Sequence, residues 1–451
     1  MILMMKAQKA ILSLFQTEVL IDSSAVWNYL QSFSDEQYVS INIDIPVKHS
    51  QYNIEKHDGN TYLIYNTLFS SMITLSDSEF IQYKNLNFSD LDIVEVLIDN
   101  GFMIPEFINE FERYEYYRHE LEDKYSSSAH YTIALTTKCN ARCIYCYEEG
   151  IDQYDMSFET AEKLANLLCQ SEKEINITWF GGEPLIKTDL IGVITEILHK
   201  NDKAFKSDII TNGSLLTESM IQDKFQEWGV EFVQITLDGM AEEYLRRKCY
   251  YRNKKDIFET VIKNIESLIE SGIYVDVRLN TDSENREECM KVTEYLKNRC
   301  SSNPYLNVYP SFLSGKSRGL VECERINYTD AIYKIYPPES GLLKSIPKIT
   351  PCFFQQEGAF VIDTDGSILC CDRDIGKRHT KIADIDKITN FDLLKKPTDI
   401  IPVVRNQCKH CVYYPKCGGG CSAAYSSPNS QDACFMEKYK IECLLNKIIK
   451  F

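Results

Sequence analysis

Three cysteines stand at a spacing that suits iron-sulfur chemistry. The segment 137–147 reads TKCNARCIYCY, so Cys139, Cys143 and Cys146 are separated by three and then two residues. Three thiolates at this spacing can ligate three irons of a 4Fe-4S cube and leave the fourth iron open. A structural zinc site wants four ligands, whereas this segment supplies three cysteines and no histidine. The spacing therefore favours a cluster with an open iron over a zinc site or three core cysteines.

The elements that must position these cysteines alternate between strand and helix. Strand-like segments lie at 131–135, 175–180, 207–211, 232–237, 274–280 and 306–309, and helical periodicity includes 158–170, 257–271 and 285–298. This alternation predicts an α/β fold with a parallel sheet and right-handed crossovers, here a six-stranded partial (β/α)6 barrel of the TIM type. The three cysteines follow the first strand, at the end of a barrel where active sites lie.

A glycine motif follows the second strand. Trp179 and Phe180 lead into Gly181, Gly182, Glu183 and Pro184. Two glycines let a ligand approach the backbone, and the Glu183 carboxylate would complement a cation. Gly-Gly-Glu-Pro by itself is more often a plain turn, but its place after a barrel strand favours a binding role.

Polar residues also end the next three strands. Asn212 follows the third strand, and Thr236 and Asp238 end the fourth. Arg278 and Asn280 share one face of the fifth strand, because alternate strand residues point to the same side. These two residues could also be mere polar ends of a strand. Together the five side chains predict a polar rim at the barrel mouth, where a ligand with hydroxyl groups would find partners.

The cysteine loop and the strand-end motifs resemble the radical S-adenosylmethionine (SAM) superfamily. The resemblance implies that SAM binds the open iron and that the segment 181–184 meets its methionine ammonium. It further implies that Tyr145 lies beside the adenine and that Arg278 and Asn280 contact the SAM carboxylate or ribose.

From residue 351 onward the strand and helix patterns give way to loops, and a second set of cysteines lies in this region. Cys408 to Cys421 alone could form a zinc knuckle, but the full set has too many ligands for one zinc. Its members are Cys352, Cys371, Cys408, Cys411, Cys417, Cys421 and Cys434. Their spacing resembles the SPASM extension of radical SAM enzymes, which implies two auxiliary 4Fe-4S clusters and three clusters in all. By that pattern Cys408, Cys411, Cys417 and Cys434 hold one auxiliary cluster, and Cys352, Cys371 and Cys421 hold the other.

The second auxiliary cluster has three assigned ligands. Some family members supply a fourth cysteine shortly after the first, but the stretch 353–359 contains none. Either Cys370 is the fourth ligand or the iron is open to water or a substrate thiolate, and we favour the open iron. Asp372 matches the position of the proposed general base in sulfatase-maturating relatives.

Composition narrows the class of protein. The chain has 451 residues, with 49 basic against 66 acidic residues and a formal net charge of -17. This charge argues against a nucleic-acid partner. The N-terminus lacks the pattern of a signal peptide, and no stretch approaches the roughly 18 apolar residues of a membrane span. We therefore expect a cytoplasmic protein with no membrane partner, in which free thiols serve metal or redox chemistry.

The region before the barrel has the order of a winged helix. Strand-like segments at 38–45 and 61–75 precede a helix at 90–100, and Pro105 is expected to start an acid-rich helix that continues to residue 123. The arrangement resembles the element that binds leader peptides in enzymes that modify ribosomally made peptides. A structural cap and a DNA-binding winged helix are the alternatives, and the acidic helix disfavours DNA. The expected domains are 1–125 for peptide recognition, 126–315 for the barrel, 316–350 as a linker and 351–451 for SPASM.

The resemblance implies a radical SAM enzyme that modifies a ribosomally synthesised precursor peptide. A 5'-deoxyadenosyl radical would abstract hydrogen from the peptide, and a flavodoxin or ferredoxin would donate the electron. We expect an intrapeptide cross-link, with a thioether favoured over a carbon-carbon bond. Sulfatase-type protein maturation, peptide epimerisation and a non-catalytic iron-sulfur or zinc scaffold remain alternatives.

Overall fold

The computed structural model divides the chain into two compact units. It describes residues 46–59, 61–124, 128–251, 256–300, 303–313, 320, 322–336, 352, 356–377, 379, 381–396, 406–420 and 437–449. The first unit comprises Met1–Asp123, Glu339–Cys352 and Val403–Phe451, and the second comprises Lys124–Pro338 and Phe353–Pro402. Within the described ranges, no helix has both the length and the apolar character needed to cross a membrane.

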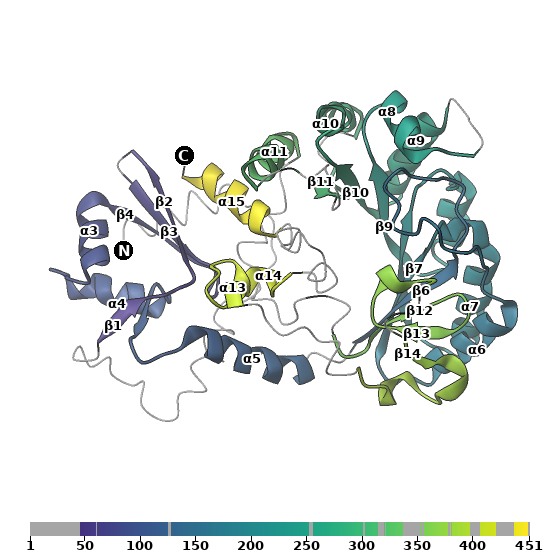
Figure 1. Ribbon diagram of the computed structural model, residues 1–451, viewed down its shortest axis with the longest axis horizontal. Coiled ribbons are helices and arrows are strands. Elements are labelled where there is room, and N and C mark those ends of the chain that lie inside the picture. Colours follow the sequence, from purple (N-terminus) through teal and green to yellow (C-terminus); the bar gives the residue numbers. More distant parts are fainter. Residues whose placement is uncertain are drawn as a thin grey trace. The chain divides into compact units, whose positions relative to one another are not determined.

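A parallel sheet forms the centre of the second unit (Figure 1). Its six consecutive strands pair in chain order and in parallel, as the sequence predicts. They are β6 (Ser128–Thr136), β7 (Glu174–Gly181), β8 (Phe205–Thr211), β9 (Val230–Leu237), β10 (Tyr274–Thr281) and β11 (Leu306–Phe312). The carboxyl ends of parallel strands share one edge of a sheet, so the loops that follow them are gathered there.

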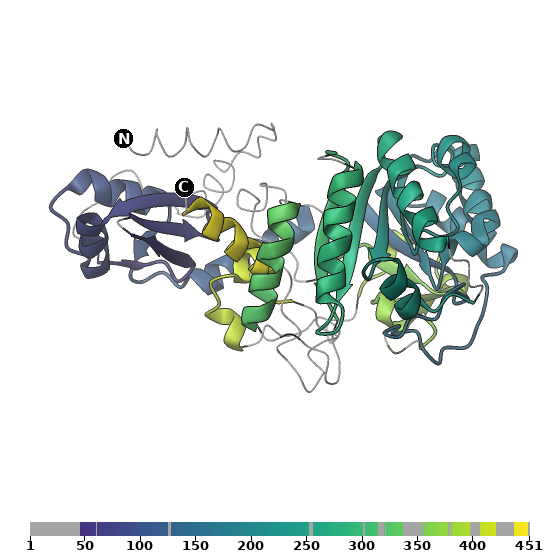
Figure 2. The ribbon, with the colours of Figure 1, turned by 90° about the horizontal axis from the view of Figure 1, so that it is seen from above.

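Helices follow these strands and lie outside the curved sheet (Figures 1 and 2). They are α6 (Phe158–Cys169), α7 (Thr188–Lys200), α8 (Ala241–Lys248), α9 (Ile257–Glu270), α10 (Arg286–Cys300) and α11 (Glu322–Ile335). Local sequence sets their ends and faces. The Ser157 hydroxyl caps α6 by accepting a hydrogen bond from the Thr160 amide, and α9 buries an apolar stripe that includes Val261, Ile265 and Leu268.

Three short strands extend this sheet beyond the predicted six. They are β12 (Ala359–Ile362), β13 (Ser367–Leu369) and β14 (Lys381–Asp384), and β12 pairs in parallel with β6. We expected only loops from residue 351 onward. These strands are too short to show a period, but Val361 and Leu369 pack with Ala134, Phe180 and Ile375 in one buried cluster. Burial against β6 and β7 therefore orders a segment whose local sequence has little strand signal.

The first unit is built on an antiparallel meander. Strands β2 (Asn53–Asp58), β3 (Thr61–Asn66) and β4 (Ser71–Ser76) pair in that order, and β1 (Val47–His49) pairs separately with β5 (Met103–Pro105). Its helices are α3 (Asp77–Asn85), α4 (Leu91–Asp99), α5 (Glu110–Lys124), α13 (Asn406–Lys409), α14 (Tyr414–Cys417) and α15 (Glu437–Ile448). Helix α4 lies within the predicted range 90–100 and is capped by Asp90, but Pro105 ends a strand and α5 begins only at Glu110. The segment 38–45 lies outside the described residues.

The two units cut across the expected domain boundaries. Helix α15 covers the meander through Ile441, Leu444 and Leu445, which pack on residues of β2 and β3. Cys408 and Tyr414 join a second cluster with residues of the N-terminal part. The segment expected to be one C-terminal domain is therefore shared, because β12, β13 and β14 extend the barrel sheet and α15 packs with the N-terminal part.

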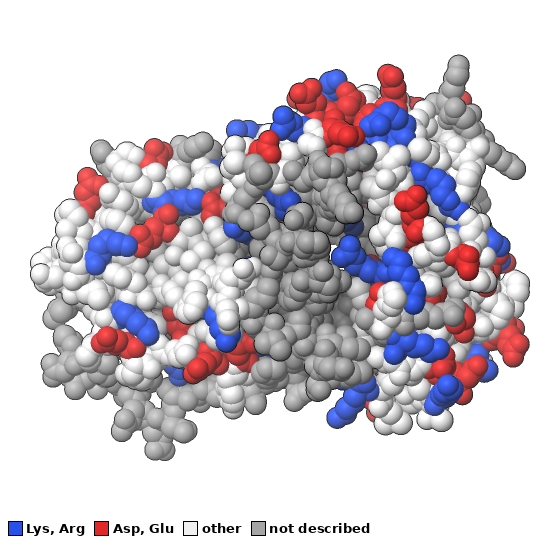
Figure 3. Space-filling view, in the orientation of Figure 1, with Lys and Arg blue, Asp and Glu red and all other residues white. Residues whose placement is uncertain are grey.

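Charged side chains of both signs are interspersed on the surface. On the face drawn in Figure 3, acidic and basic side chains alternate over the described parts of each unit.

Candidate functional site

The loop after β6 carries Cys139, Cys143 and Cys146. All three are half-buried free thiols. Burial raises the pKa of each, and for Cys139 burial and then the nearby Glu183 raise it to about 12. In the described residues no three metal-ligating side chains converge on the position of a single ion. A cube distributes its thiolates over different irons, so three thiols carried on one loop could ligate three irons and leave the fourth open. Because a cluster binds thiolates, binding it would require the three thiols to lose their protons.

The glycine motif after β7 lies directly against this loop. The Gly182 amide donates to the Thr136 carbonyl at 2.9 Å, and the Glu183 amide donates to the Lys138 carbonyl at 3.0 Å. A Cβ on Gly181 would lie 2.2 Å from the Thr136 oxygen, and one on Gly182 would lie 2.5 Å from the Lys138 oxygen. We expected the glycines to admit a ligand. The contact that requires them in the structure is with the chain's own backbone at the start of the cysteine loop.

Glu183 is fully buried and linked to β8. Its carboxylate accepts hydrogen bonds from the Thr211 hydroxyl at 2.7 Å, the Asn212 amide at 2.9 Å and the Leu185 amide at 3.2 Å. Burial raises its pKa despite these donors. The Asn212 side chain in turn donates to Asn140 in the cysteine loop at 2.8 Å. Glu183 thus ties β7, β8 and the loop together, and its contact with an ammonium stays a prediction.

The end of α8 holds the other side of the cysteine loop. The Arg142 amide donates to the Lys248 carbonyl at 3.0 Å, and the Ile144 amide donates to the Arg247 carbonyl at 3.0 Å. The Tyr251 amide donates back to Asn140 at 3.1 Å. We call the segment 247–251 the strap. The loop is therefore fixed by backbone hydrogen bonds on two sides.

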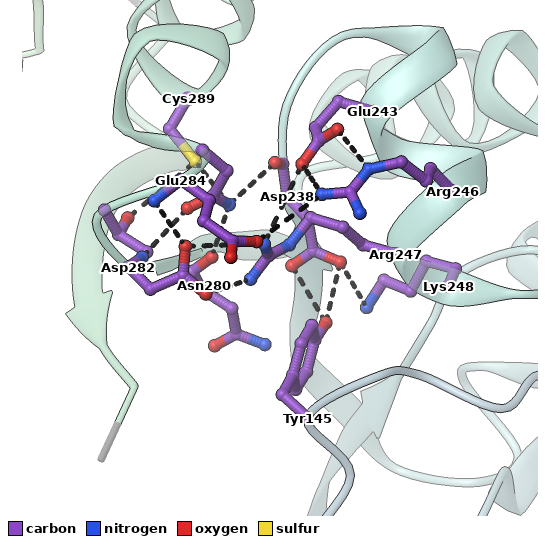
Figure 4. A network of polar contacts seen from close by, with 12 residues as sticks. Tyr145, Asp238, Glu243, Arg246, Arg247, Lys248, Asn280, Asp282, Glu284 and Cys289 are labelled. Atoms are coloured by element: carbon purple, nitrogen blue, oxygen red, sulfur yellow. Dashed lines mark hydrogen bonds and ion pairs between the residues drawn. The ribbon is translucent and has the colours of Figure 1, made fainter. Parts of the chain in front are cut away.

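A buried polar network connects the loop to the strap (Figure 4). The Tyr145 hydroxyl reaches both oxygens of the fully buried Asp238, at 2.7 and 2.8 Å. The Lys248 ammonium lies 3.5 Å from the same carboxylate and donates to the Thr236 hydroxyl at 2.5 Å. Burial acts to lower the pKa of Lys248, but Asp238 and Tyr145 outweigh it and hold the pKa well above its usual value. Three predicted site residues, Tyr145, Thr236 and Asp238, thus surround the Lys248 ammonium, which the sequence analysis did not predict.

A second buried ion pair lies beside the first. Arg247 and Asp282 are both fully buried and pair at 2.8 Å. The Asn285 side chain donates to the carbonyl oxygens of Asp238 and Asn280, each at 2.9 Å. These residues link the strand ends of β9 and β10, as Figure 4 shows. A run of charged residues at a helix end normally indicates a solvated surface, so their burial had no signal in the sequence.

Arg278 and Asn280 retain unused hydrogen-bonding atoms. Both lie on one face of β10, and the buried Arg278 Nε and Asn280 Oδ1 have no hydrogen-bond partner in the described structure. Buried polar atoms are normally satisfied by protein, water or ligand. A donor and an acceptor left at the mouth of the sheet fit a ligand with carboxylate and hydroxyl groups.

Asp372 follows β13 in the same unit. Its carboxylate lies 3.5 Å from the Cys371 sulfur. Burial raises the pKa of Asp372, and Arg278 acts to lower it. Burial and then Asp372 raise the pKa of Glu148 in the cysteine loop to about 7. Asp372 thus lies in an environment that favours its protonated form.

The later cysteines are distributed over both units. Cys408, Cys411 and Cys417 belong to the first unit, in or beside α13 and α14, and Cys352 belongs to it as well. Cys371 belongs to the second unit, and its neighbour Cys370 is buried. Cys421 and Cys434 lie outside the described residues. The assignment of these cysteines to two clusters remains a prediction.

Comparison with known proteins finds similarity in the central segment of the chain. Residues 133–296 match the model of the Radical SAM superfamily. A probable GTP 3',8-cyclase of Methanococcus maripaludis is 30% identical over 158 residues, which are 34% of this chain and 50% of that protein. Fe-coproporphyrin III synthase of Methanosarcina barkeri is 26% identical over 166 residues, 36% of this chain and 39% of that protein. The chain thus spans half or less of these relatives.

Solved structures share the fold. The structure described as native anSMEcpe with bound AdoMet aligns with 71% of this chain and 98% of its own, at 18% identity and a TM-score of 0.58. A second structure of that protein, with bound AdoMet and the Kp18Cys peptide, aligns with the same coverage, identity and TM-score. At this identity the likeness shows a common fold. The predicted radical SAM fold is confirmed, and the SPASM and peptide-recognition modules remain predictions.

Proposed function

We propose that the radical SAM domain at residues 133–296 makes this chain a radical SAM enzyme acting on a ribosomally made peptide. One observation supports the assignment as a radical SAM enzyme. The cysteine loop follows β6, is fixed on two sides by backbone hydrogen bonds, and borders the polar atoms of Arg278 and Asn280 that have no hydrogen-bond partner among the described residues. Cys139, Cys143 and Cys146 would hold a 4Fe-4S cluster. With SAM bound, that cluster would supply a 5'-deoxyadenosyl radical for hydrogen abstraction.

The chain's own residues position and shield the reacting groups. Arg278 and Asn280 would bind the carboxylate or ribose of SAM with the atoms that have no protein partner. Tyr145 is held in one orientation by Asp238, so that its ring could pack beside the adenine. Glu183 and the glycines keep the loop pressed against β7, which helps to exclude water from a reactive intermediate.

The first unit supports the proposal that the substrate is a peptide. Its meander has two edge strands, β2 and β4, and an extended peptide can bind such an edge by backbone hydrogen bonds. The solved anSMEcpe structure that shares the fold holds a peptide together with AdoMet. We propose that a leader peptide binds this unit and that the modified residues gain an intrapeptide cross-link, with a thioether favoured. The later cysteines would hold two auxiliary clusters, and an open iron near Cys371 would bind a substrate thiolate.

The activity is tested with anaerobically reconstituted protein, SAM and dithionite. Release of 5'-deoxyadenosine is expected from the wild type and not from Cys143→Ala, and a peptide from a neighbouring small reading frame should lose two hydrogens. Iron content tests the zinc-scaffold alternative, because three clusters require about twelve irons per chain. Release of no 5'-deoxyadenosine by an iron-loaded wild type would refute the enzyme assignment.

A further inference from the structure

Lys248 places a buried positive charge beside the cysteine loop. It is the last residue of α8 and only 2% exposed. Its carbonyl accepts a hydrogen bond from the amide of Arg142, the residue before Cys143, at 3.0 Å. Its ammonium lies 5.7 Å from the centre of the Tyr145 ring, two residues after Cys143 (Figure 4). Arg142 and Tyr145 flank Cys143 in the sequence, so the Lys248 ammonium lies beside the part of the loop that carries Cys143.

The ion pair between Lys248 and Asp238 is longer than the neighbouring Arg247–Asp282 pair, and the ammonium also donates to the neutral Thr236 hydroxyl. Arg247 and Asp282 form a close pair at 2.8 Å, whereas Lys248 lies 3.5 Å from Asp238. Charge-assisted N–H to O bonds are usually about 2.7–2.9 Å long. The two oxygens of Asp238 also accept the Tyr145 hydroxyl, so this carboxylate is shared between two donors. In a buried site the remaining field of Lys248 is only weakly screened.

We propose that Lys248 raises the reduction potential of the cluster held by Cys139, Cys143 and Cys146. This inference rests on the proposed function, since it requires that these cysteines hold a cluster. The potential of an iron-sulfur cluster depends on net charge, hydrogen bonds to sulfur and burial. Reduction adds one electron to the cluster, and a fixed cation near a ligand thiolate stabilises the more negative state. Lys248 is therefore a positioning residue that acts through its charge.

The geometry separates this electrostatic role from a structural one. The hydrogen bonds of the strap to the loop use backbone atoms of residues 247, 248 and 251. A substitution of the Lys248 side chain leaves these bonds available. Removing the charge should therefore change the potential without releasing the loop.

The test is a redox titration of the anaerobically reconstituted full chain without SAM, followed by electron paramagnetic resonance. The cluster of interest is the one whose signal changes when SAM is added to a reduced sample. In Lys248→Gln we expect the ratio of reduced to oxidised cluster at a fixed potential to fall at least tenfold, which is about 59 mV for a one-electron couple. Lys248→Arg should keep the ratio within about threefold of wild type, or about 28 mV by the same constant.

Two further variants test whether the charge of Lys248 causes the shift. Asp238→Asn removes the compensating anion and should shift the ratio in the opposite direction. Lys138 precedes Cys139 in sequence, but its side chain is 43% exposed and pairs with Asp155 at 2.8 Å. Lys138→Gln is therefore a matched control that should change the ratio less than about twofold, because solvent screens its charge.

The outcomes distinguish the inference from the proposed function. If the wild type assembles no SAM-sensitive cluster, the proposed function fails. If the wild type has that cluster and Lys248→Gln titrates like wild type, only the inference fails. Unchanged potential with weaker SAM binding would assign Lys248 to the SAM site and overturn the inference, and so would a folded Lys248→Gln variant that takes up no iron.

Discussion

Replacing Gly182 by alanine tests how the glycine motif supports the cysteine loop. The added Cβ would lie 2.5 Å from the Lys138 oxygen, 2.7 Å from its carbonyl carbon and 2.8 Å from the Thr137 oxygen. All three are backbone atoms, so no side chain can rotate away. Overpacking of this kind costs about 1–3 kcal/mol. The same shift would weaken the hydrogen bonds at 2.9 and 3.0 Å that join the motif to the loop, each worth about 1 kcal/mol.

We therefore expect Gly182→Ala to lower the free energy of unfolding of the second unit by about 2–4 kcal/mol. Gly192 in α7 is the matched control, because a Cβ there would meet nothing within 4 Å. Gly192→Ala should leave stability unchanged or raise it by about 0.5–1 kcal/mol, since alanine is the better helix former.

Denaturant unfolding of the apo protein, followed by tryptophan fluorescence, measures this difference. Two of the three tryptophans, Trp179 and Trp228, are buried in the second unit. Iron uptake by the same variants should fall for Gly182→Ala and stay at the wild-type level for Gly192→Ala. Equal unfolding midpoints for the two alanine variants would refute the reasoning from close backbone contact.

Three further predictions follow from buried charges. Burial raises the pKa of Asp208 from 3.8 to about 6, so the unfolded state ionises first and stability should fall as pH rises from about 3.8 to 6. Asp208→Asn should remove this fall in denaturant titrations at pH 4 and pH 7. Arg247→Met removes the 2.8 Å ion pair with the buried Asp282 and should cost about 3–5 kcal/mol in unfolding free energy, whereas the exposed Arg246→Met should cost about 1 kcal/mol or less. Arg278→Met should weaken SAM binding in calorimetry about tenfold or more with little loss of stability, because its Nε has no protein partner to lose.

The barrel could be predicted from sequence because its signals are local. Each of the six parallel strands has apolar residues at consecutive or alternate positions, and helices such as α9 carry a clear apolar stripe. The same locality places Cys139, Asn212, Asp238 and Arg278 at strand ends. The elements that the sequence did not predict are stabilised by packing against distant parts of the chain. Val361 and Leu369 order β12 and β13 only by contact with β6 and β7, and the burial of α15 depends on a sheet almost four hundred residues earlier in the chain.

The site shows the same division. Cysteine spacing and strand-end polarity indicated which residues gather, but not what the neighbours of the loop do. Gly181 and Gly182 serve close backbone contact, which a sequence cannot distinguish from an opening for a ligand. Lys248 lies in an Arg-Arg-Lys run, a pattern that normally indicates a solvent-exposed helix end. Its burial depends on the pairing with Asp238, which directly follows β9, and on the hydrogen bond to Thr236.

The most direct test of the central claim is electron paramagnetic resonance of the reduced, reconstituted protein with and without SAM. An open iron in the cluster of Cys139, Cys143 and Cys146 predicts that SAM changes the spectrum of the wild type. In a variant with all three cysteines replaced by alanine, SAM should change nothing, while signals from any other cluster persist. A wild-type spectrum that is identical with and without SAM would contradict the account.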